Sequence, residues 1–340
     1  MKDAPCMQCI FISRSTFPKV IYDELSKHFQ IDVWNNDGIG MWSRKAAPPP
    51  DVLRRKFSEC DGAVITIGDR ITEDILRDAK IRILATYSVG FDHIDLHAAT
   101  RLRIPVAYTP EVLVESVADF AIGLMLSAAR RIVDGDKIIR SGNAETVWGE
   151  YMGDEVWGKT LGILGLGNIG IAVARRAAAF KMRIIYWSKH RKPNVEIAMG
   201  VSPVTLDELF RQSDYLIISV ALTPETRHLV NEDRLRLMKR NAYVINIARG
   251  AVIDTPALIK ALREGWIRGA ALDVYEDEPL PTNSELLSLN NVVLTPHIAS
   301  ASFDTRNNMA EIIIQSVINV LIHGKPPIYI ANPEAMGDGR

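Results

Sequence analysis

Short apolar, β-branched runs alternate with longer amphipathic runs along the chain. In the first third of the sequence the short runs predict strands at Cys9–Ser13, Ile31–Trp34, Ala63–Ile67, Ile83–Thr86 and Val106–Tyr108. Apolar residues recur at helical spacing between them, for example over Phe17–Phe29 and Thr72–Ala79. Strands that alternate with helices are typical of a parallel sheet covered by helices on both faces.

A second series of the same kind follows a long helical segment. The pattern predicts one helix over Val114–Ser141, and its apolar centre, Phe120–Leu126, indicates a buried position. The strands predicted after it are Thr160–Leu164, Ile184–Trp187, Tyr215–Val220, Ala242–Ile247, Ala270–Asp273 and Val292–Thr295. A last helix, Thr305–His323, ends before a Pro-Pro pair, and its periodicity does not show which sheet it covers. We therefore expect an α/β fold with two doubly wound parallel sheets.

The bulk composition is that of an ordinary globular enzyme. The chain has 340 residues, enough for two domains, with 47% hydrophobic and 24% charged residues. A formal net charge of −1 gives no electrostatic reason to expect a nucleic-acid or membrane partner. No run approaches the roughly 18 uncharged apolar residues of a membrane span, and Met1–Pro5 lacks the apolar core of a signal peptide. We expect a cytoplasmic protein whose partner is a small molecule.

The chain contains only three cysteines, Cys6, Cys9 and Cys60. Cys6 and Cys9 form a C-x-x-C, but the two further soft ligands that a zinc site needs at similar spacing are absent from the sequence. We therefore interpret them as two unrelated thiols near the first strand and expect no metal site. Sparse cysteines also favour a cytoplasmic location.

A glycine-rich turn follows the first strand of the second series. Gly165, Gly167 and Gly170 form a G-x-G-x-x-G after the apolar run Leu161–Leu164, where the helical pattern Ile169–Phe180 begins. Gly165 permits the tight turn, Gly167 lets a pyrophosphate approach the backbone, and Gly170 lets the helix pack on the strand. The helix N-terminus favours the diphosphate charge. The motif alone is a weak signal, but this strand–turn–helix context predicts a dinucleotide site.

The next strand ends without the acidic residue that commonly binds the ribose hydroxyls of NAD. It is followed instead by Ser188, Lys189, His190 and Arg191. Basic side chains at this point favour the 2′-phosphate of NADP(H), which we expect as the preferred cofactor. The alternative is that these charges are merely solvated and that NAD(H) binds through backbone contacts.

Arg249, Glu278 and His297 each come shortly after one of the last three predicted strands. Because ligands of open α/β sheets bind at the carboxyl ends of strands, we expect these side chains to converge beside the nicotinamide. The forked donors of Arg suit a carboxylate and a carbonyl, and His can donate a proton near neutral pH. A carboxylate beside the His would favour its charged form. This combination predicts reduction of a 2-oxo acid by hydride transfer.

Ordered motifs extend this interpretation to nearly the whole chain. They are Tyr87–Asp95, Pro110–Asp119, Gly165–Gly170, Asn246–Gly250, Leu272–Pro279 and Thr295–Ala299. With them the chain resembles the D-isomer-specific 2-hydroxyacid dehydrogenases, and most closely the archaeal glyoxylate reductases. The resemblance implies an oxidoreductase that reduces glyoxylate, and also hydroxypyruvate, with NAD(P)H. It further implies a flavodoxin-like substrate domain of residues 1–109 and 300–340, a Rossmann cofactor domain of residues 110–299 that includes the long helix, and a homodimer through the cofactor domains.

The resemblance also implies a role for individual residues. Arg249 binds the substrate carboxylate and carbonyl, His297 donates the proton, and Glu278 is the partner of His297. The backbone amides of Val89 and Gly90 hold the other side of the carboxylate. The implied cofactor contacts are Gly165, Gly167, Asn168, Ile169, Gly170, Ser188, Lys189, His190, Arg191, Ile247, Ala248, Arg249, Asp273, His297, Ile298 and Ala299.

Two departures from the family pattern and several alternatives remain. Ala299 stands where the family often has Gly, and Ser188 stands where NAD users carry an acid. Other enzymes of the family are alternatives: hydroxypyruvate reductase and D-lactate, phosphoglycerate or formate dehydrogenase. Glu278 stands where formate dehydrogenases carry Gln, and a regulatory domain after the last helix, expected for phosphoglycerate dehydrogenase, is missing. A dinucleotide-sensing corepressor of the same fold is a different class, but only Ala331–Arg340 has the character of its long tail.

Overall fold

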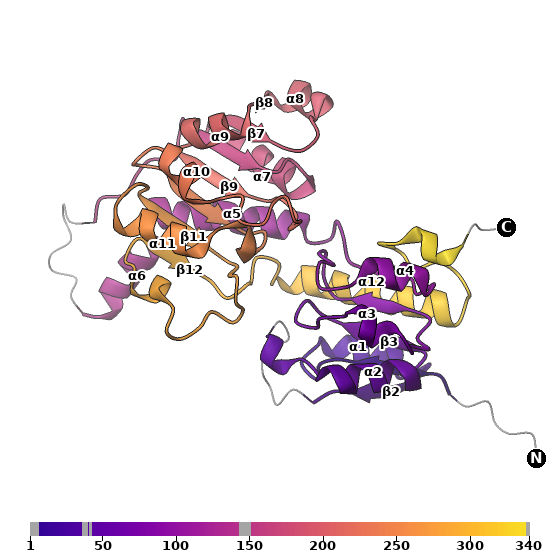
Figure 1. The fold of residues 1–340 in the computed structure, drawn as a ribbon. Coiled ribbons are helices and arrows are strands. Elements are labelled where there is room, and N and C mark those ends of the chain that lie inside the picture. Colours follow the sequence, from indigo (N-terminus) through magenta and orange to yellow (C-terminus); the bar gives the residue numbers. More distant parts are fainter. Residues whose placement is uncertain (1–6, 36–39, 41–42, 143–150, 338–340) are drawn as a thin grey trace, which may run out of the picture. The chain divides into compact units, whose positions relative to one another are not determined.

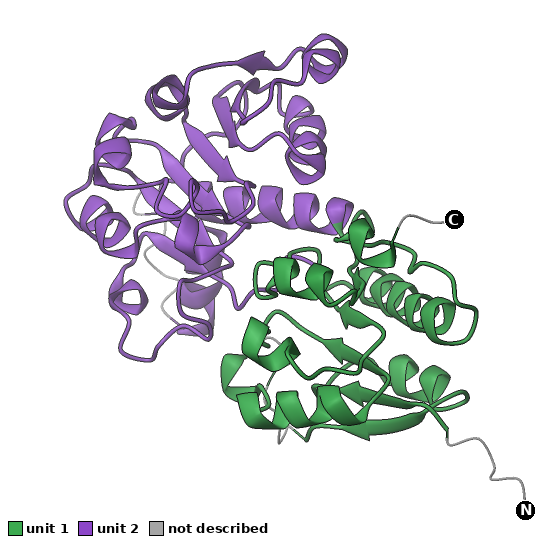
Figure 2. Ribbon diagram, turned by 45° about the vertical axis from the view of Figure 1, so that its right-hand side comes forward, with its two compact units in different colours: residues 1–113, 301–340 green, residues 114–300 purple. Residues whose placement is uncertain are grey.

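The structure, a computed structural model, describes residues 7–35, 40, 43–142 and 151–337. The described residues belong to two compact units, which Figure 2 colours separately. Unit 1 comprises Met1–Leu113 and Ala301–Arg340, and unit 2 comprises Val114–Ser300. Cys6 lies outside the described residues.

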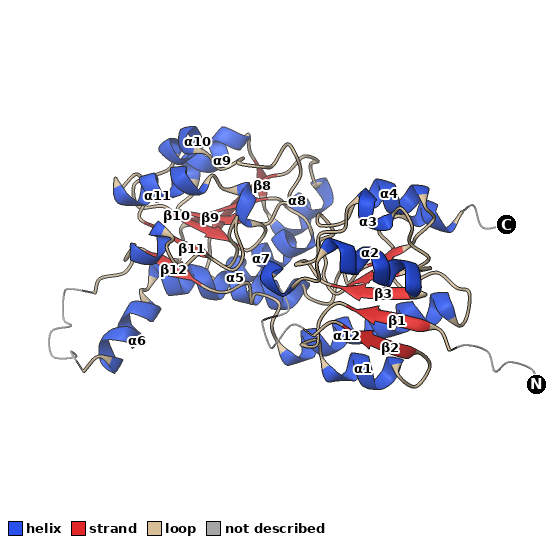
Figure 3. Ribbon diagram, turned by 60° about the horizontal axis from the view of Figure 1, so that its bottom comes forward, coloured by secondary structure: helices blue, strands red, loops and turns tan. Residues whose placement is uncertain are grey.

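Unit 1 is built on a parallel sheet, drawn as arrows in Figures 1 and 3. Its strands are β1 (Cys9–Ile12), β2 (Gln30–Val33), β3 (Gly62–Ile65), β4 (Leu84–Thr86) and β5 (Val106–Ala107). They lie in the order β2-β1-β3-β4-β5, with Ile10 of β1 opposite Ile31 on one side and Gly62 on the other. This is the doubly wound order in which ligands bind beyond the carboxyl ends of the strands.

Helices cover both faces of this sheet. They are α1 (Lys19–Leu25), α2 (Pro50–Glu59), α3 (Glu73–Leu76), α4 (Leu96–Arg101) and α12 (Phe303–Leu321), with 3₁₀ turns η1 (Arg44–Ala46) and η5 (Pro333–Met336). Helices α2, α3 and α4 share one apolar core, to which Phe57, Ile75 and Ala98 contribute. Helix α12 contacts α1, β3 and β4. The last helix therefore covers the sheet of unit 1, which its periodicity could not show.

Unit 2 is built on a longer parallel sheet. Its strands are β6 (Thr160–Leu164), β7 (Arg183–Trp187), β8 (Ser202–Pro203), β9 (Tyr215–Ile218), β10 (Tyr243–Asn246), β11 (Gly269–Leu272) and β12 (Val292–Leu294). They lie in the order β12-β11-β10-β9-β6-β7-β8. The direction of winding reverses between β6 and β9, as expected of a dinucleotide-binding sheet. The pattern did not predict β8, because a two-residue edge strand has no measurable alternation. With the sheet of unit 1, this confirms the predicted fold class.

The helices of unit 2 also form two layers. They are α5 (Val114–Ala129), α6 (Ile132–Arg140), α7 (Asn168–Ala178), α8 (Pro193–Met199), α9 (Leu206–Gln212), α10 (Glu232–Leu237) and α11 (Thr255–Arg263), with 3₁₀ turns η3 (Gly250–Val252) and η4 (Glu285–Ser288). Helices α9, α10 and α11 share a core with the sheet, whereas α5 packs on α7 and on β10, β11 and β12. Among the helices that the structure describes, none combines the length and apolarity that crossing a membrane requires.

The prediction of one helix over Val114–Ser141 is wrong. The segment forms α5 and α6, which are separated at Arg131, a residue in the left-handed region with φ +54°. The N–H of Asp154 donates to the carbonyl oxygen of Ala129 at 2.8 Å. In a continuous helix this oxygen would accept from the N–H four residues later, so Asp154 takes the place of that donor. Helix α5 is buried along one side, but α6 has no buried residue. The break therefore separates a core helix from an exposed one.

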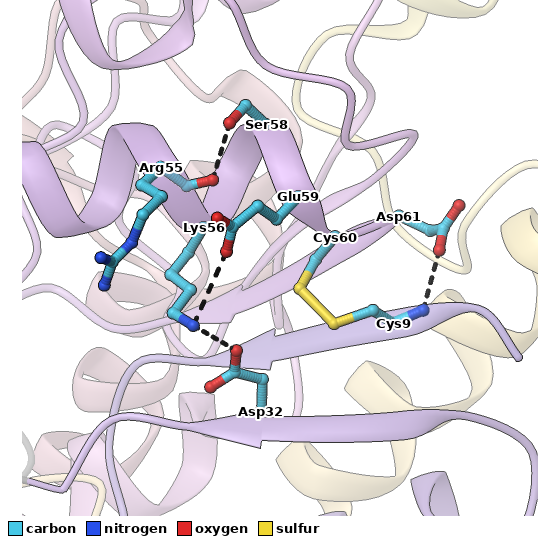
Figure 4. The surroundings of a disulfide bond; sticks show 8 residues. All are labelled: Cys9, Asp32, Arg55, Lys56, Ser58, Glu59, Cys60 and Asp61. Carbon is cyan, nitrogen blue, oxygen red and sulfur yellow. Dashed lines mark hydrogen bonds and ion pairs between the residues drawn. A yellow bond between two sulfur atoms is a disulfide. The ribbon is translucent and has the colours of Figure 1, made fainter.

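The interpretation of the cysteines also changes. Cys9 is joined to Cys60 in a disulfide that links the start of β1 to the end of α2, 51 residues away (Figure 4). Lys56 donates to Asp32 at 2.5 Å beside it. Cys9, Asp32 and Cys60 are also the group of possible metal ligands found among the described residues, but the disulfide engages both sulfurs. Cys9 is therefore not an unrelated thiol: its partner is distant in sequence, and C-x-x-C spacing gave no sign of it.

Candidate active site

The turn between β6 and α7 has the geometry of a phosphate cradle. Gly165 has φ +100°, and a Cβ there would lie 2.8 Å from the backbone N of Val220. A Cβ on Gly170 would lie 2.2 Å from the carbonyl oxygen of Gly165. By contrast, no described atom lies within 4 Å of the Cβ position of Gly167. Gly165 and Gly170 are thus required by packing, and Gly167 leaves the approach to the helix open.

Helix α7 begins directly at this turn. Its N-cap is Gly167, and no described side chain caps the N-terminus. The first-turn amides of Asn168, Ile169 and Gly170 therefore point out of the helix end, where they favour an anion. These residues fit the diphosphate of a dinucleotide.

The four residues after β7 have different environments. Lys189, His190 and Arg191 are exposed, and Ser188 is partly exposed. Arg191 pairs with Glu196 of α8 at 2.5 Å, and Glu196 also accepts a hydrogen bond from Tyr186 at 2.6 Å. Arg191 is therefore already held by an acid, whereas no described residue pairs with Lys189 in an ion pair or hydrogen bond.

Arg249 follows β10 in a turn that Asn246 organises. Asn246 is fully buried; its Nδ2 donates to the carbonyl oxygen of Arg249 at 3.0 Å, and its Oδ1 accepts from the N–H of Ala248 at 3.1 Å. Ile247 is buried and Ala248 and Arg249 are partly exposed. The turn is therefore held by a side chain within the motif, and Nη1 of Arg249 donates to the carbonyl oxygen of Ala248 at 2.9 Å. Asn246 was not among the residues predicted for the site, although an Asn at the end of an apolar strand is visible in the sequence.

Glu278 and His297 are in direct contact. His297 Nδ1 lies 2.8 Å from Glu278 Oε2, and Glu278 Oε1 accepts from the N–H of Tyr275 at 3.1 Å. About four-fifths of each side chain is buried, the exposed fractions being 21% for His297 and 20% for Glu278. The two residues come from segments after β11 and after β12. The structure thus brings together two groups that are 19 residues apart in sequence.

Asp273 orders the segment that carries His297. It is fully buried, and its carboxylate accepts from the hydroxyl of Thr295 at 2.6 Å and from the N–H groups of Ile298 and Ala299 at 2.9 Å each. The N–H of His297 donates to the carbonyl oxygen of Asp273 at 2.8 Å. These bonds hold His297 at φ +55°, a conformation that side chains rarely adopt. The sequence suggested a cofactor contact for Asp273 but not this role.

Charges in the site favour an ionised Glu278. Burial alone would raise the pKa of Glu278, but the hydrogen bond and charge of His297, the N–H of Tyr275 and the charge of Arg249 outweigh it and hold the pKa below its usual value. Burial dominates at Asp273, whose pKa is raised. The contacts of Glu278 therefore favour its ionised form, whereas burial opposes ionisation of Asp273.

Val89 and Gly90 lie in unit 1, in the loop after β4. Within the described part of the chain, no group accepts a hydrogen bond from either backbone N–H. The carbonyl oxygen of Gly90 accepts from the hydroxyl of Ser88 at 2.7 Å, and Ser88 contacts Thr86 at 2.8 Å. The hydroxyl chain fixes the loop and leaves two adjacent amide donors for a carboxylate.

Comparisons with known proteins show the family of the chain. The family model for the NAD-binding domain of D-isomer specific 2-hydroxyacid dehydrogenases matches residues 122–299. A glyoxylate reductase of Pyrococcus horikoshii is 44% identical over 333 residues, with 96% of each chain covered. A solved structure from Thermus thermophilus matches with TM-score 0.86 and 37% identity, covering 95% of this chain and 100% of that one.

A second solved structure is an NADPH-dependent glyoxylate/hydroxypyruvate reductase of Sinorhizobium meliloti in complex with NADP and malonate. It matches with TM-score 0.85 and 29% identity, covering 98% of this chain and 99% of that one. The matched range, residues 122–299, includes the glycine turn, Arg249, Glu278 and His297. The chain therefore belongs to the D-isomer specific 2-hydroxyacid dehydrogenase family.

Proposed function

We propose that the protein reduces glyoxylate, and also hydroxypyruvate, to the corresponding 2-hydroxy acid with NADPH. The observation that carries the proposal is the contact of 2.8 Å between His297 and Glu278 in the unit that also holds Arg249 and the glycine turn. The names of the relatives from Pyrococcus horikoshii and Sinorhizobium meliloti support the choice of substrates.

Each side chain has a separate task in this reaction. Arg249 binds the carboxylate and polarises the carbonyl of the 2-oxo acid. His297 donates a proton from Nε2 to the developing alkoxide, because Nδ1 faces Glu278. Glu278 keeps the ring oriented and favours its protonated form. The amides of Val89 and Gly90 are the proposed carboxylate donors of unit 1.

The nicotinamide cofactor, when bound, supplies the hydride for the carbonyl carbon. The amides of Asn168, Ile169 and Gly170 hold its diphosphate, and Ile247–Arg249 and His297–Ala299 border its nicotinamide end. Asp273 is fully buried, so its part is to order the loop behind the nicotinamide end rather than to contact the cofactor. At the adenosine end, Ser188, Lys189 and His190 read the 2′-phosphate, with Arg191 in a lesser part because Glu196 already holds it. This arrangement favours NADPH over NADH.

The assembly is a homodimer formed through unit 2, in the cytoplasm. Helix α6 supports the dimer: none of its residues is buried, although Ile132 and Ile139 on it are apolar and more than half exposed. The partner is a second copy of this chain. Light scattering should give twice the chain mass of 37.8 kDa, and Ile139→Asp should shift the mass toward that of one chain. A monomeric wild-type protein would contradict the dimer.

A spectrophotometric panel of 2-oxo acids with NADPH and NADH tests the function. Glyoxylate and hydroxypyruvate should give higher kcat/KM than 2-oxoisocaproate or phenylpyruvate, and NADPH should be preferred. A preference for the bulky acids would contradict the assignment of substrate. Tight NADPH binding with no turnover on any 2-oxo acid would instead favour the dinucleotide sensor.

A further inference from the structure

The turn that carries Arg249 packs directly on the loop that carries Glu278. A Cβ added to Gly250 would lie 1.8 Å from the carbonyl carbon of Tyr275 and 2.3 Å from the backbone N of Glu276. The two backbones are therefore in direct contact at this point, and no residue larger than Gly fits at position 250. The distance between turn and loop has to be maintained by contacts on either side.

Tyr275, on the N-terminal side of this peptide, also orients Glu278. The N–H of Tyr275 donates to Glu278 Oε1 at 3.1 Å, while Tyr275 Oη donates to the carbonyl oxygen of Thr295 at 2.8 Å. A shift of the Tyr275–Glu276 peptide away from Gly250 would therefore move the acceptor of His297 as well.

The side chain of Glu276, the second residue of this peptide, makes one such contact. Its Oε1 lies 2.5 Å from Nε2 of His228, and Arg227 lies 3.9 Å from the same oxygen. Thr255, the first residue of α11, also hydrogen-bonds Glu276. His228 is itself fixed, because its N–H donates to the carbonyl oxygen of Ala251 in η3 at 2.8 Å.

The geometry points to His228 and Glu276 as a positioning pair that holds the Glu278 loop against the Arg249 turn. Neither residue is assigned to substrate or cofactor, and His228 reaches the loop from the segment after β9. The pair acts through Glu278, since Glu276 precedes it by two residues and does not contact His297. This inference rests on the proposed function for its kinetic consequences, but the structural coupling is independent of the substrate.

The charge state of Glu276 agrees with this role. Burial opposes ionisation, but the hydrogen bonds of His228 and Thr255 outweigh it and lower the pKa of Glu276. The pair is only partly exposed, with 25% of the Glu276 side chain accessible. A charged acceptor facing an imidazole is a stronger tether than a neutral pair.

Substitutions in the same loop separate positioning from a general loss of charge. Glu276→Ala should lower kcat for glyoxylate roughly tenfold, because small misplacements of reacting groups are costly, with a smaller change in KM. It should also move the high-pH limb of the reductive rate to lower pH, as removing the Glu278 charge does. Glu276→Gln keeps an acceptor for His228 but not the charge, so its kcat should lie between those of the wild type and Glu276→Ala. Asp277→Asn, an exposed neighbour, is the matched control and should change neither quantity.

The partner side gives a second test. His228→Ala should reproduce the effects of Glu276→Ala, and the double variant should be no worse than either single one, because both remove one contact. An unchanged kcat and pH limb in Glu276→Ala, or an equal loss in Asp277→Asn, would overturn the proposal. The His297 ring signal in NMR, assigned by its loss in His297→Asn, gives a readout without substrate: its chemical shift should change in Glu276→Ala and not in Asp277→Asn. If the wild type reduces no 2-oxo acid, the proposed function is contradicted. The NMR signal of His297 then still tests whether His228 and Glu276 position the Glu278 loop.

Discussion

One carboxylate oxygen of Glu278, Oε2, lies 2.8 Å from the ring nitrogen Nδ1 of His297. The other oxygen of Glu278 accepts from the N–H of Tyr275, so the carboxylate cannot rotate without losing a bond. His297 is held from its backbone by Asp273. The pair is therefore fixed from both sides, with Nδ1 of His297 facing the carboxylate.

The first prediction concerns pH. Reduction needs the protonated ring of His297, and the lowered pKa of Glu278 keeps its carboxylate charged at neutral pH. Glu278→Gln keeps a hydrogen-bond acceptor but removes the charge that stabilises the imidazolium. The ring then loses its proton more easily, so the high-pH limb of the reductive rate should move down by roughly one pH unit, about 1.4 kcal/mol. A pH–rate profile with saturating NADPH checks this, and an upward or absent shift would contradict the pairing.

The second prediction separates proton transfer from cofactor binding. His297→Asn removes the proton donor and should lower kcat by about 10²–10⁴-fold. The glycine turn is untouched, so the Kd for NADPH measured by calorimetry should change little. Near-normal turnover in this variant would leave the family assignment standing but remove the mechanism.

The third prediction concerns Arg249. Arg249→Ala removes charged hydrogen bonds worth about 1.5–3 kcal/mol each, so kcat/KM for glyoxylate should fall at least ~100-fold. Arg240→Ala is the matched control, because Arg240 is an exposed Arg just before β10, whereas Arg249 follows the strand. Initial rates over a range of glyoxylate concentrations measure both. Equal effects of the two variants would show that Arg249 is misassigned.

Sequence reasoning found the parts of the site that are local. The glycine turn is a single segment, and Arg249, Glu278 and His297 could be placed because parallel strands bring their carboxyl ends to one edge. The contact between His297 and Glu278 follows from that topology and from the resemblance. The contacts that make it rigid do not: Asp273 binds amides 25 and 26 residues away, and their geometry depends on how two loops pack.

The errors have the same origin. Periodicity continues through Arg131, so the break between α5 and α6 could not be seen; it depends on the bond from Asp154 to Ala129. Cys9 and Cys60 lie close together because β1 is next to β3 in the sheet. The spacing of the cysteines along the sequence does not indicate this strand order. The ion pair of Arg191 with Glu196 also depends on how α8 follows β7, so the basic cluster alone did not indicate it.

The fourth prediction follows from that cluster. Ser188→Asp places a negative charge against a 2′-phosphate and should lower the ratio of kcat/KM for NADPH over NADH by roughly tenfold, or about 1.4 kcal/mol. Lys189→Ala should lower the ratio more than Arg191→Ala, because Glu196 already holds Arg191. Ser202→Asp adds the same charge to β8 as a control. An unchanged ratio in Ser188→Asp would show that these side chains do not read the phosphate.

The last prediction concerns the disulfide of unit 1. Cys9 and Cys60 close a loop of 51 residues, and a cross-link of this kind typically contributes about 2–4 kcal/mol by restricting the unfolded chain. Cys9→Ser, or reduction of the wild type, should therefore lower the free energy of unfolding measured in denaturant by about that amount. Activity should persist, because Cys9 is the first residue of β1 and the loop of Val89 and Gly90 follows the opposite, carboxyl end of the sheet. Cys6→Ser is the control and should leave stability unchanged. Titration of the unreduced protein should detect one free thiol of three; three free thiols, with no effect of reductant on unfolding, would contradict the disulfide.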